Sequence, residues 1–248
     1  MAARLSVNVN KVATLRNSRG GSAPSVLQAV RTCLTAGARG ITVHPRADER
    51  HITVRDVLDI AELLASEREE VELNIEGDPR PDWLRMVAQV RPHQATLVPV
   101  KPGEITSDAG WQPEMKTGDE LRSVVSDLRE RAIRVSLFVD PEPRAVAWAE
   151  QVGADRVELY TGPFARAWLD GWDAARHTFS RYAEAAAQAH ELGLGVNAGH
   201  DLDLDNLVLF RRLNHLDEVS IGHALISRAL FVGLETVVHE YLQVLAER

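Results

Sequence analysis

The feature of this sequence that most constrains its fold is a regular alternation of short, β-branched apolar segments with longer segments of helical periodicity. The strand-like segments are 5–9, 41–44, 71–75, 95–100, 135–140, 156–159, 194–197 and 218–221. The helix-like segments are 25–36, 54–65, 81–90, 118–131, 141–151, 180–192, 204–213 and a last one that ends near Glu247. Eight strand–helix units of about 31 residues each are the expected size of a (β/α)₈ barrel. The sequence therefore predicts one barrel domain over residues 1–248, with additional short helices in its βα loops.

A doubly wound parallel sheet is the competing topology for alternating strands and helices. Such sheets usually carry a glycine-rich G-x-G-x-x-G turn after the first strand, where a dinucleotide binds. No such turn follows segment 5–9. We therefore favour the barrel over the open sheet.

Charge and composition exclude several classes of protein. The net charge of −8 argues against a general nucleic-acid binder, because an excess of basic residues is needed to offset phosphate repulsion. Basic residues nevertheless gather near the first two strand ends, at Lys11, Arg16, Arg19, Arg46 and Arg50. A locally positive pocket in an acidic protein favours a small anionic substrate.

The sequence predicts a cytoplasmic protein without a membrane partner. No apolar run approaches the ~20 residues of a membrane-spanning helix, and no signal peptide is visible in the charged N-terminal segment. The single cysteine, Cys33, cannot form an internal disulfide and lies in an apolar stretch. A buried structural thiol is the favoured interpretation of Cys33 over a nucleophile.

Two βα connections are unusually long. Segment 101–117 is rich in glycine, aspartate and proline, a composition that predicts a mobile loop able to close over a site. Segment 160–179 carries Phe164, Trp168 and Trp172 at helical spacing. We expect these aromatic residues to form an extra helix that packs on the barrel or on another subunit, rather than a substrate platform.

Polar clusters stand where several of the strand-like segments end. They are Asn8 to Lys11, His44 to Arg46, Asn74 to Glu76, Asn197 to His200, and Gly222 with His223. The carboxyl ends of parallel strands meet at one face of a barrel, and that face holds the active site of such enzymes. These clusters therefore predict one enzyme site.

Two histidines and a carboxylate are the candidate acid–base groups. His44 and His200 each follow a strand directly, and imidazole is the side chain best able to exchange protons near neutral pH. Glu76 ends the third strand and is a candidate general base. Glu158 lies within a strand-like segment, either as an inward-facing site residue or as half of a buried ion pair. The sequence leaves these two alternatives for Glu158 open.

Glycine and basic residues indicate phosphate sites. Gly222 and His223 stand where a helix begins after the eighth strand, a position that binds phosphate in many barrels. Arg19, Arg46 and His51 lie in loops where they can hold a second anion. His44, Glu76 and His200 could also form a metal ligand set, but neither H-x-H after the first strand nor H-E-x-x-H is present. We therefore predict no metal.

Several motifs resemble those of the pyridoxine 5′-phosphate synthase family. The motifs in chain order are 8–20 (NVNKVATLRNSRG), 40–46 (GITVHPR) with 50–52 (RHI), 136–140 (SLFVD), 158–162 (ELYTG), 196–200 (VNAGH) and 221–224 (IGHA). They extend over nearly the whole chain, and the first two are the most specific.

The resemblance implies a barrel enzyme, assembled as a homo-octamer, that acts without metal or organic cofactor. It joins 3-amino-2-oxopropyl phosphate to 1-deoxy-D-xylulose 5-phosphate and releases pyridoxine 5′-phosphate, phosphate and water. His44 and Glu76 then correspond to general bases and His200 to a general acid. The corresponding contacts to the amino-ketone phosphate are Asn8, Gly222 and His223. The corresponding contacts to the deoxyxylulose phosphate are Asn10, Lys11, Arg46, His51 and Thr106, and Arg19 and Asp201 belong to the substrate shell.

Two positions depart from the family pattern. Many members carry Asp-His where this chain has Asn10-Lys11, and Gly where it has Asp201. These departures keep open a non-catalytic barrel that binds sugar phosphates. A metal-dependent barrel hydrolase or isomerase is a separate alternative.

Overall fold

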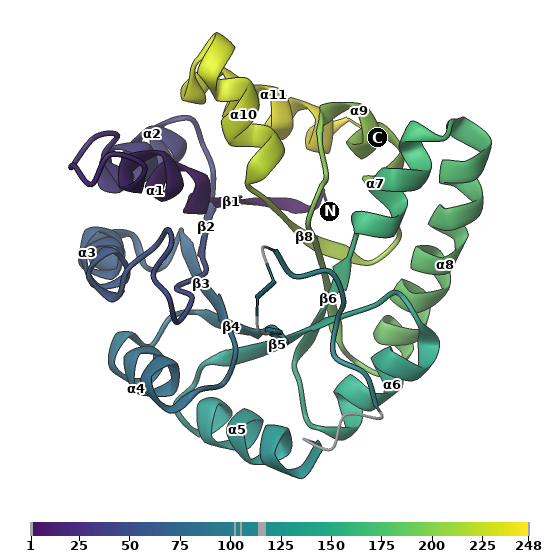
Figure 1. Cartoon of the computed structure of the whole chain (residues 1–248). Helices are drawn as coiled ribbons and strands as arrows, with labels where there is room; N and C mark the ends of the chain where they lie inside the picture. Colours follow the sequence, from purple (N-terminus) through teal and green to yellow (C-terminus); the bar gives the residue numbers. More distant parts are fainter. Residues whose placement is uncertain (1, 102, 105, 114–117, 248) are drawn as a thin grey trace.

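Eight parallel strands form one closed barrel, as the sequence predicts (Figure 1). The computed structural model describes residues 2–101, 103–104, 106–113 and 118–247. The strands are β1 (Arg4–Asn8), β2 (Gly40–Val43), β3 (Glu72–Gly77), β4 (Gln94–Leu97), β5 (Arg134–Val139), β6 (Arg156–Tyr160), β7 (Gly195–Gly199) and β8 (Leu216–Ile221). Each strand pairs with the next along the chain, and β8 closes the barrel on β1.

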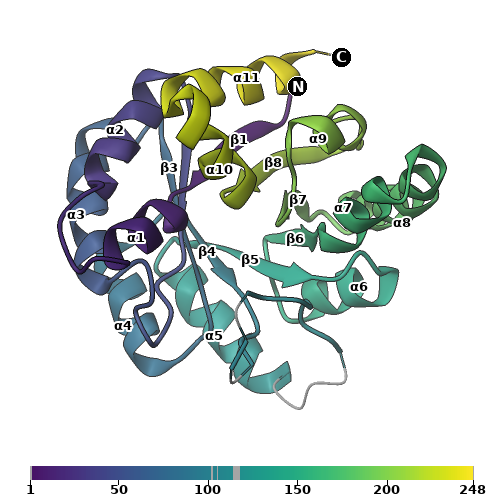
Figure 2. The same cartoon turned by 45° about the horizontal axis from the view of Figure 1, so that its top comes forward.

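The helices form an outer ring around this barrel (Figures 1 and 2). They are α1 (Asn10–Asn17), α2 (Val26–Thr35), α3 (Val54–Leu64), α4 (Pro81–Val90), α5 (Gly118–Glu130), α6 (Pro143–Gln151), α7 (Gly162–Leu169), α8 (Trp172–Glu191), α9 (Leu204–Phe210), α10 (His223–Val232) and α11 (Leu234–Ala246), with a short 3₁₀ turn η1 (Ala65–Glu67) before β3. Local signals set several helix starts. The side chain of Thr53 caps α3 together with Asp56, and Pro81 occupies the first turn of α4.

The apolar core lies between the strands and the helices. Outward-facing strand residues such as Leu5, Val7, Ile41 and Val43 are almost fully buried there. Cys33 on α2 belongs to the same core, and burial raises the pKa of its thiol to about 12. The structure thus confirms Cys33 as a buried thiol.

The interior of the barrel is polar, because the alternate strand positions carry hydroxyl, amide and charged side chains. Ser6 and Thr42 are hydrogen-bonded at 2.7 Å, and Thr96 donates to Asn74 at 2.9 Å. Asn197 on β7 reaches across the barrel to Gln94 on β4, with 3.4 Å between Nδ2 and Oε1. The first two contacts join neighbouring strands, whereas the Asn197–Gln94 contact joins two strands that are not neighbours in the barrel.

Charged pairs fill the end of the barrel where the strands begin. Arg4 and Arg134 both donate to the Glu72 carboxylate, at 2.9 Å and 2.7 Å. Arg156 donates to the Asn197 side chain at 2.8 Å. Buried polar groups cost free energy unless they are hydrogen-bonded, and this network satisfies most of those in the barrel interior.

Three helices differ from the expectation. Helix α8 begins at Trp172 rather than at Ser180. Segment 8–20 contains the helix α1, which the periodicity did not predict. The expected single C-terminal helix is two helices, because Gly233 adopts a φ of +90° between α10 and α11, outside the helical region. Helix α11 lies against β1, α2 and α9 (Figure 2).

The aromatic segment 160–179 contains the expected extra helix, α7, which carries Phe164 and Trp168, whereas Trp172 begins α8. Phe164 is fully buried, and its ring contacts Tyr182 on α8 and Phe210 on α9, with centroids 6.0 Å and 5.0 Å apart. Trp168 and Trp172 contact each other, with centroids 5.5 Å apart. Phe164 therefore packs on the helical ring of this chain, whereas Trp172 is 48% exposed.

Within the described ranges, none of the helices has the length and apolar character that crossing a membrane requires.

The close approach of β1 and β2 predicts a strict need for glycine at position 40. A Cβ on Gly40 would lie 2.8 Å from the Ser6 Cβ. Gly40→Ala should therefore lower the free energy of unfolding by about 1–3 kcal/mol, since overpacking forces backbone shifts. Urea denaturation measures this change.

Gly21→Ala is the matched control, because a Cβ at Gly21 meets nothing within 4 Å. It should change stability by less than about 0.5 kcal/mol. Equal losses in the two variants would contradict the proposed steric cause.

Candidate active site

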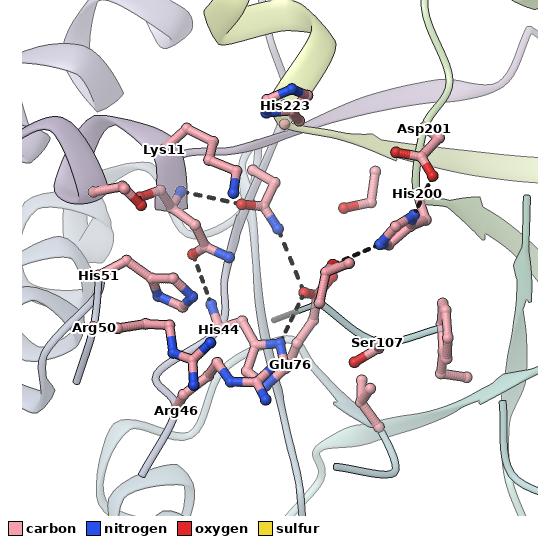
Figure 3. A pocket seen from close by; sticks show the side chains of 18 of the residues that line it. Lys11, His44, Arg46, Arg50, His51, Glu76, Ser107, His200, Asp201 and His223 are labelled. Carbon is pink, nitrogen blue, oxygen red and sulfur yellow. Dashed lines mark hydrogen bonds and ion pairs between the residues drawn. The ribbon is translucent and has the colours of Figure 1, made fainter. Parts of the chain in front are cut away.

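A pocket of about 480 Å³ opens at the carboxyl ends of the strands (Figure 3). The predicted residues that line it are Asn8, Asn10, Lys11, His44, Arg46, His51, Glu76, Thr106, His200, Asp201, Gly222 and His223. Side chains distant in sequence thus meet at one site. Arg19 lies outside this pocket, exposed in the turn after α1.

His44 and Glu76 lie side by side at the ends of β2 and β3. The His44 Nδ1 is 3.7 Å from the Glu76 Oε2, which is longer than a hydrogen bond. Asn8 approaches the same Glu76 oxygen, with its Nδ2 at 3.4 Å. Asn10 accepts a hydrogen bond from the backbone N–H of His44 at 2.9 Å and so fixes the start of the β2 loop.

The imidazole of His44 is held in its neutral form. Burial, together with the positive charges of His51, Arg46, Arg80 and Arg50, lowers the pKa of His44 to about 3. No described residue forms a hydrogen bond with its Nε2. A neutral imidazole with a free nitrogen facing a pocket can accept a proton from a bound substrate.

The carboxyl group of Glu76 is held in its protonated form at neutral pH. The pKa of Glu76 is raised to about 8, because burial and the negative charge of Glu218 outweigh the opposing effect of a hydrogen bond from Ser220. A carboxyl group whose pKa lies near the working pH can both give and take a proton.

Glu158 faces the pocket and forms no ion pair within the described chain. Its side chain is 3% exposed, and its Oε2 has no hydrogen-bond partner among the described residues. Burial, Glu76 and Glu218 all raise the pKa of Glu158 well above the usual range of a carboxyl group. Of the two alternatives from the sequence, the structure supports the inward-facing site residue. A protonated acid there can donate a hydrogen bond to a substrate oxygen.

Basic side chains form the other wall of the pocket, where Lys11, Arg46, Arg50 and His51 lie together (Figure 3). Burial and the neighbouring charges of Lys11 and Arg46 lower the pKa of His51 to about 4. The Arg46 and Arg50 guanidinium groups both donate to the backbone carbonyl of Glu104, each at 3.2 Å. These cations suit a phosphate ester.

The segment between β4 and α5 crosses the mouth of the pocket. Besides the contact through Glu104, its Thr106 hydroxyl lies 2.7 Å from the His200 Nε2. Trp111 continues the segment onto β5 through a backbone hydrogen bond to Phe138 at 2.8 Å. Residues 102, 105 and 114–117 of the expected lid lie outside the described residues. The closing motion of this loop remains a prediction.

Helix α10 begins at the pocket, because Gly222 is its N-cap and His223 its first residue. A Cβ at Gly222 would lie 3.0 Å from the Asn8 Cβ and from the Asn8 carbonyl oxygen, so the close approach of β1 requires glycine. The first N–H groups of a helix lack intrahelical partners and attract anions. The predicted helix start is confirmed, and phosphate binding there remains a prediction.

Sequence reasoning missed several residues that line the pocket. They are Thr14, Val98, Ser107, Phe138 and Ser220. Ser220 had a detectable signal, because it stands two residues before Gly222 and alternate strand residues share one face. Ser107 lies in the long loop and had no such signal.

In the part of the chain that the structure describes, no three His, Cys, Asp or Glu side chains are grouped so as to hold a metal ion. His44, Glu76 and His200 therefore do not form a metal ligand set in this arrangement.

Comparisons with known proteins agree with the geometry. Residues 5–247 match the family model described as "Pyridoxal phosphate biosynthesis protein PdxJ". The chain is 51% identical to the pyridoxine 5′-phosphate synthase of Leptospira biflexa, over 98% of this chain and 97% of that protein. It is 49% identical to the synthase of Porphyromonas gingivalis, over 98% and 99% of the two chains.

Solved structures with low sequence identity share the fold. The tryptophan synthase A-subunit of Pyrococcus furiosus superposes with a TM-score of 0.60 at 12% identity, over 98% of each chain. Phosphoribosyl anthranilate isomerase of Thermus thermophilus gives a TM-score of 0.57 at 15% identity, also over 98% of each chain. At such identities the likeness supports the barrel alone.

The raised pKa of Glu76 predicts a pH-dependent cost to stability. Unfolding returns the carboxyl group to its ordinary pKa of 4.5, so the unfolded state ionises between pH 4.5 and about 8 while the folded state stays protonated. Stability should therefore fall as pH rises through that range. Glu76→Gln cannot ionise, and it should be more stable than the parent by about 2 kcal/mol at pH 8 and similar at pH 4.

Urea denaturation at pH 4, 6 and 8 tests this. Glu67→Gln, at an exposed position before β3, is the control and should follow the parent at every pH. If the free energy of unfolding of Glu76→Gln changes with pH in the same way as that of the parent, Glu76 is not a buried, protonated carboxyl group.

Proposed function

Because the chain belongs to the family of the pyridoxal phosphate biosynthesis protein PdxJ, we propose that it is a pyridoxine 5′-phosphate synthase. It condenses 3-amino-2-oxopropyl phosphate with 1-deoxy-D-xylulose 5-phosphate and releases pyridoxine 5′-phosphate, phosphate and water. The observation that carries the proposal is the convergence of His44, Glu76 and His200, from three separate strand ends, on one basic pocket. The matching relatives are named pyridoxine 5′-phosphate synthase, and the match covers nearly their whole length.

The three groups are suited to different proton transfers. His44 acts as a general base, since its neutral imidazole is free to take a proton. Glu76 exchanges protons in either direction, because its pKa of about 8 lies close to neutral pH. His200 acts as the general acid. Forming a pyridine ring from two carbonyl compounds requires several such transfers, along with phosphate loss and dehydrations.

The two phosphates have separate places in this proposal. The deoxyxylulose phosphate lies at the basic wall with Lys11, Arg46 and His51, and Asn10 and Thr106 contact the same substrate. The amino-ketone phosphate lies at the N-terminus of α10, in contact with Asn8, Gly222 and His223. Asp201 and Arg19 belong to the substrate shell in this proposal. Asp201 lines the pocket, whereas Arg19 lies outside it.

No metal or organic cofactor enters the proposed reaction, so the test is an assay of metal-free protein with both substrates. We expect pyridoxine 5′-phosphate and one equivalent of phosphate, detected by absorbance and by mass spectrometry. Loss of activity with a chelator and rescue by zinc would instead select a metal-dependent barrel enzyme. Tight binding of deoxyxylulose phosphate without turnover would select a non-catalytic binding barrel.

His200→Asn is the variant that links this assay to the site. Asparagine tolerates the φ of +83° at position 200 but cannot exchange a proton. We expect kcat to fall by about 10²–10⁴-fold with little change in melting temperature. A matching loss of the fold would make His200 a packing residue.

We further infer that the protein acts in the cytoplasm and assembles as a homo-oligomer, an octamer on the family resemblance. Exposed apolar side chains at the C-terminal end of α10 support an assembly, because Leu230 is 68% and Phe231 is 88% exposed. Adjacent apolar side chains of this exposure are typical of protein interfaces. Apart from other copies of itself, we expect the protein to bind the two small phosphorylated substrates, and neither nucleic acid nor a membrane.

Replacing Phe231 tests the assembly. Phe231→Ser should shift the protein to smaller species in sedimentation velocity, because it removes the most exposed apolar side chain of this surface. Val54→Ser, at a 44% exposed position on α3, is the control and should keep the parent's size. A monomeric parent protein would refute the inference.

A further inference from the structure

Two consecutive residues after β7 adopt a backbone conformation that residues other than glycine rarely adopt. His200 has a φ of +83° and Asp201 a φ of +59°. Such residues persist where surrounding contacts hold them, and they cluster at functional sites. Both residues line the pocket, so this conformation sets where two of its side chains point.

Hydrogen bonds fix the backbone of this turn. The Thr161 hydroxyl contacts the carbonyl oxygens of Gly199, at 2.6 Å, and of His200. The Asn206 side chain donates to the carbonyl oxygen of Asp201 at 3.1 Å. Asn206 is itself held in the capping box of α9. Three successive carbonyl groups are thus anchored, so the direction of the two side chains is set.

The Asp201 carboxylate lies against the His200 ring. The Asp201 Oδ2 is 2.7 Å from the His200 Nδ1, and on the other side of the ring the Thr106 Oγ1 is 2.7 Å from Nε2 (Figure 3). The Tyr160 ring packs edge-on at 5.2 Å and restricts the tilt of the imidazole. A carboxylate can only accept a hydrogen bond, so the Nδ1 must carry the proton.

Positive groups around Asp201 keep it ionised. The hydrogen bond to His200 lowers the pKa of Asp201, burial opposes this, and the charges of His223 and Arg166 lower it further. The side chain is 43% exposed, so water also solvates it. An acceptor that remains charged and anchored is able to select one tautomer of the neighbouring imidazole.

We propose that Asp201 is a positioning residue that fixes His200 as the Nδ1–H tautomer and leaves Nε2 as the nitrogen that exchanges protons in the pocket. In carboxylate–histidine pairs generally, this choice of tautomer decides which ring nitrogen can react. The effect on turnover rests on the proposed function, whereas the tautomer is a property of the free protein.

Asp201→Gly is the decisive variant, because glycine suits a φ of +59° and retains the backbone N–H. A structural role for Asp201 predicts lower stability in this variant. A positioning role predicts an equal or higher melting temperature together with a kcat about tenfold lower, since one ordering contact of a general acid is lost. KM should stay within about twofold, because the substrate contacts remain. Asp205→Asn, exposed on α9, is the matched control and should match the parent in all three quantities.

Nuclear magnetic resonance of ¹⁵N-histidine-labelled protein reads the tautomer directly. In the parent protein at a pH where the ring is neutral, we expect the proton on the His200 Nδ1. In Asp201→Gly the proton should move toward Nε2. A parent spectrum with the proton on Nε2, or an unchanged kcat in Asp201→Gly, would overturn the proposal.

The two proposals fail in different ways. If the parent protein makes no pyridoxine 5′-phosphate, the proposed function is wrong, and the spectrum alone decides the tautomer. If the parent is active and Asp201→Gly loses fold and activity together, Asp201 is a packing residue and the positioning proposal is wrong.

Discussion

The alternation of side chains along eight parallel strands of one closed barrel is the constraint on which the rest of the structure depends. One set of positions meets the helices and is apolar, and the other set faces the barrel axis. In this chain the inward set is mostly polar, from the Arg4–Glu72 pair through the Thr96–Asn74 hydrogen bond to Glu76, with Phe138 at the pocket as an apolar exception. The pocket-lining residues on the strands are therefore the top layer of a hydrogen-bonded interior. Most barrels of this kind fill that space with branched apolar side chains.

The electrostatics of the site follow from where its charges can be solvated. The basic wall with Arg46 and Arg50 lies toward the mouth, where it suppresses protonation of His44. The carboxyl groups of Glu76 and Glu158 lie deeper, where burial and mutual repulsion favour their neutral forms. At neutral pH the floor of the pocket thus carries little net charge, and its rim is positive. Such a gradient directs phosphates to the rim and leaves proton exchange to the floor.

The sequence predicted the fold and most of the lining of the candidate site, because both follow from strand ends. His44, Glu76 and His200 each stand where an apolar run stops, and parallel strands bring such positions together. The break at Gly233 was missed, because glycine also occurs inside helices and only its φ reveals the turn. Thr106 was available only through the family resemblance, since nothing in its local sequence marks it. The sequence could not decide whether Glu158 forms a buried ion pair, because that depends on whether a cation faces it across the barrel in three dimensions.

The contacts of the loop after β4 have an energetic consequence for any ligand of this pocket. Glu104 occupies donors of Arg46 and Arg50, and Thr106 occupies the Nε2 of His200, so one segment satisfies groups on both walls. An incoming molecule that uses these groups must first displace internal partners. Its measured affinity then reports the difference between two sets of hydrogen bonds rather than the strength of one. The pocket should consequently favour ligands that contact both walls at once, since only such ligands replace all the internal hydrogen bonds that binding breaks.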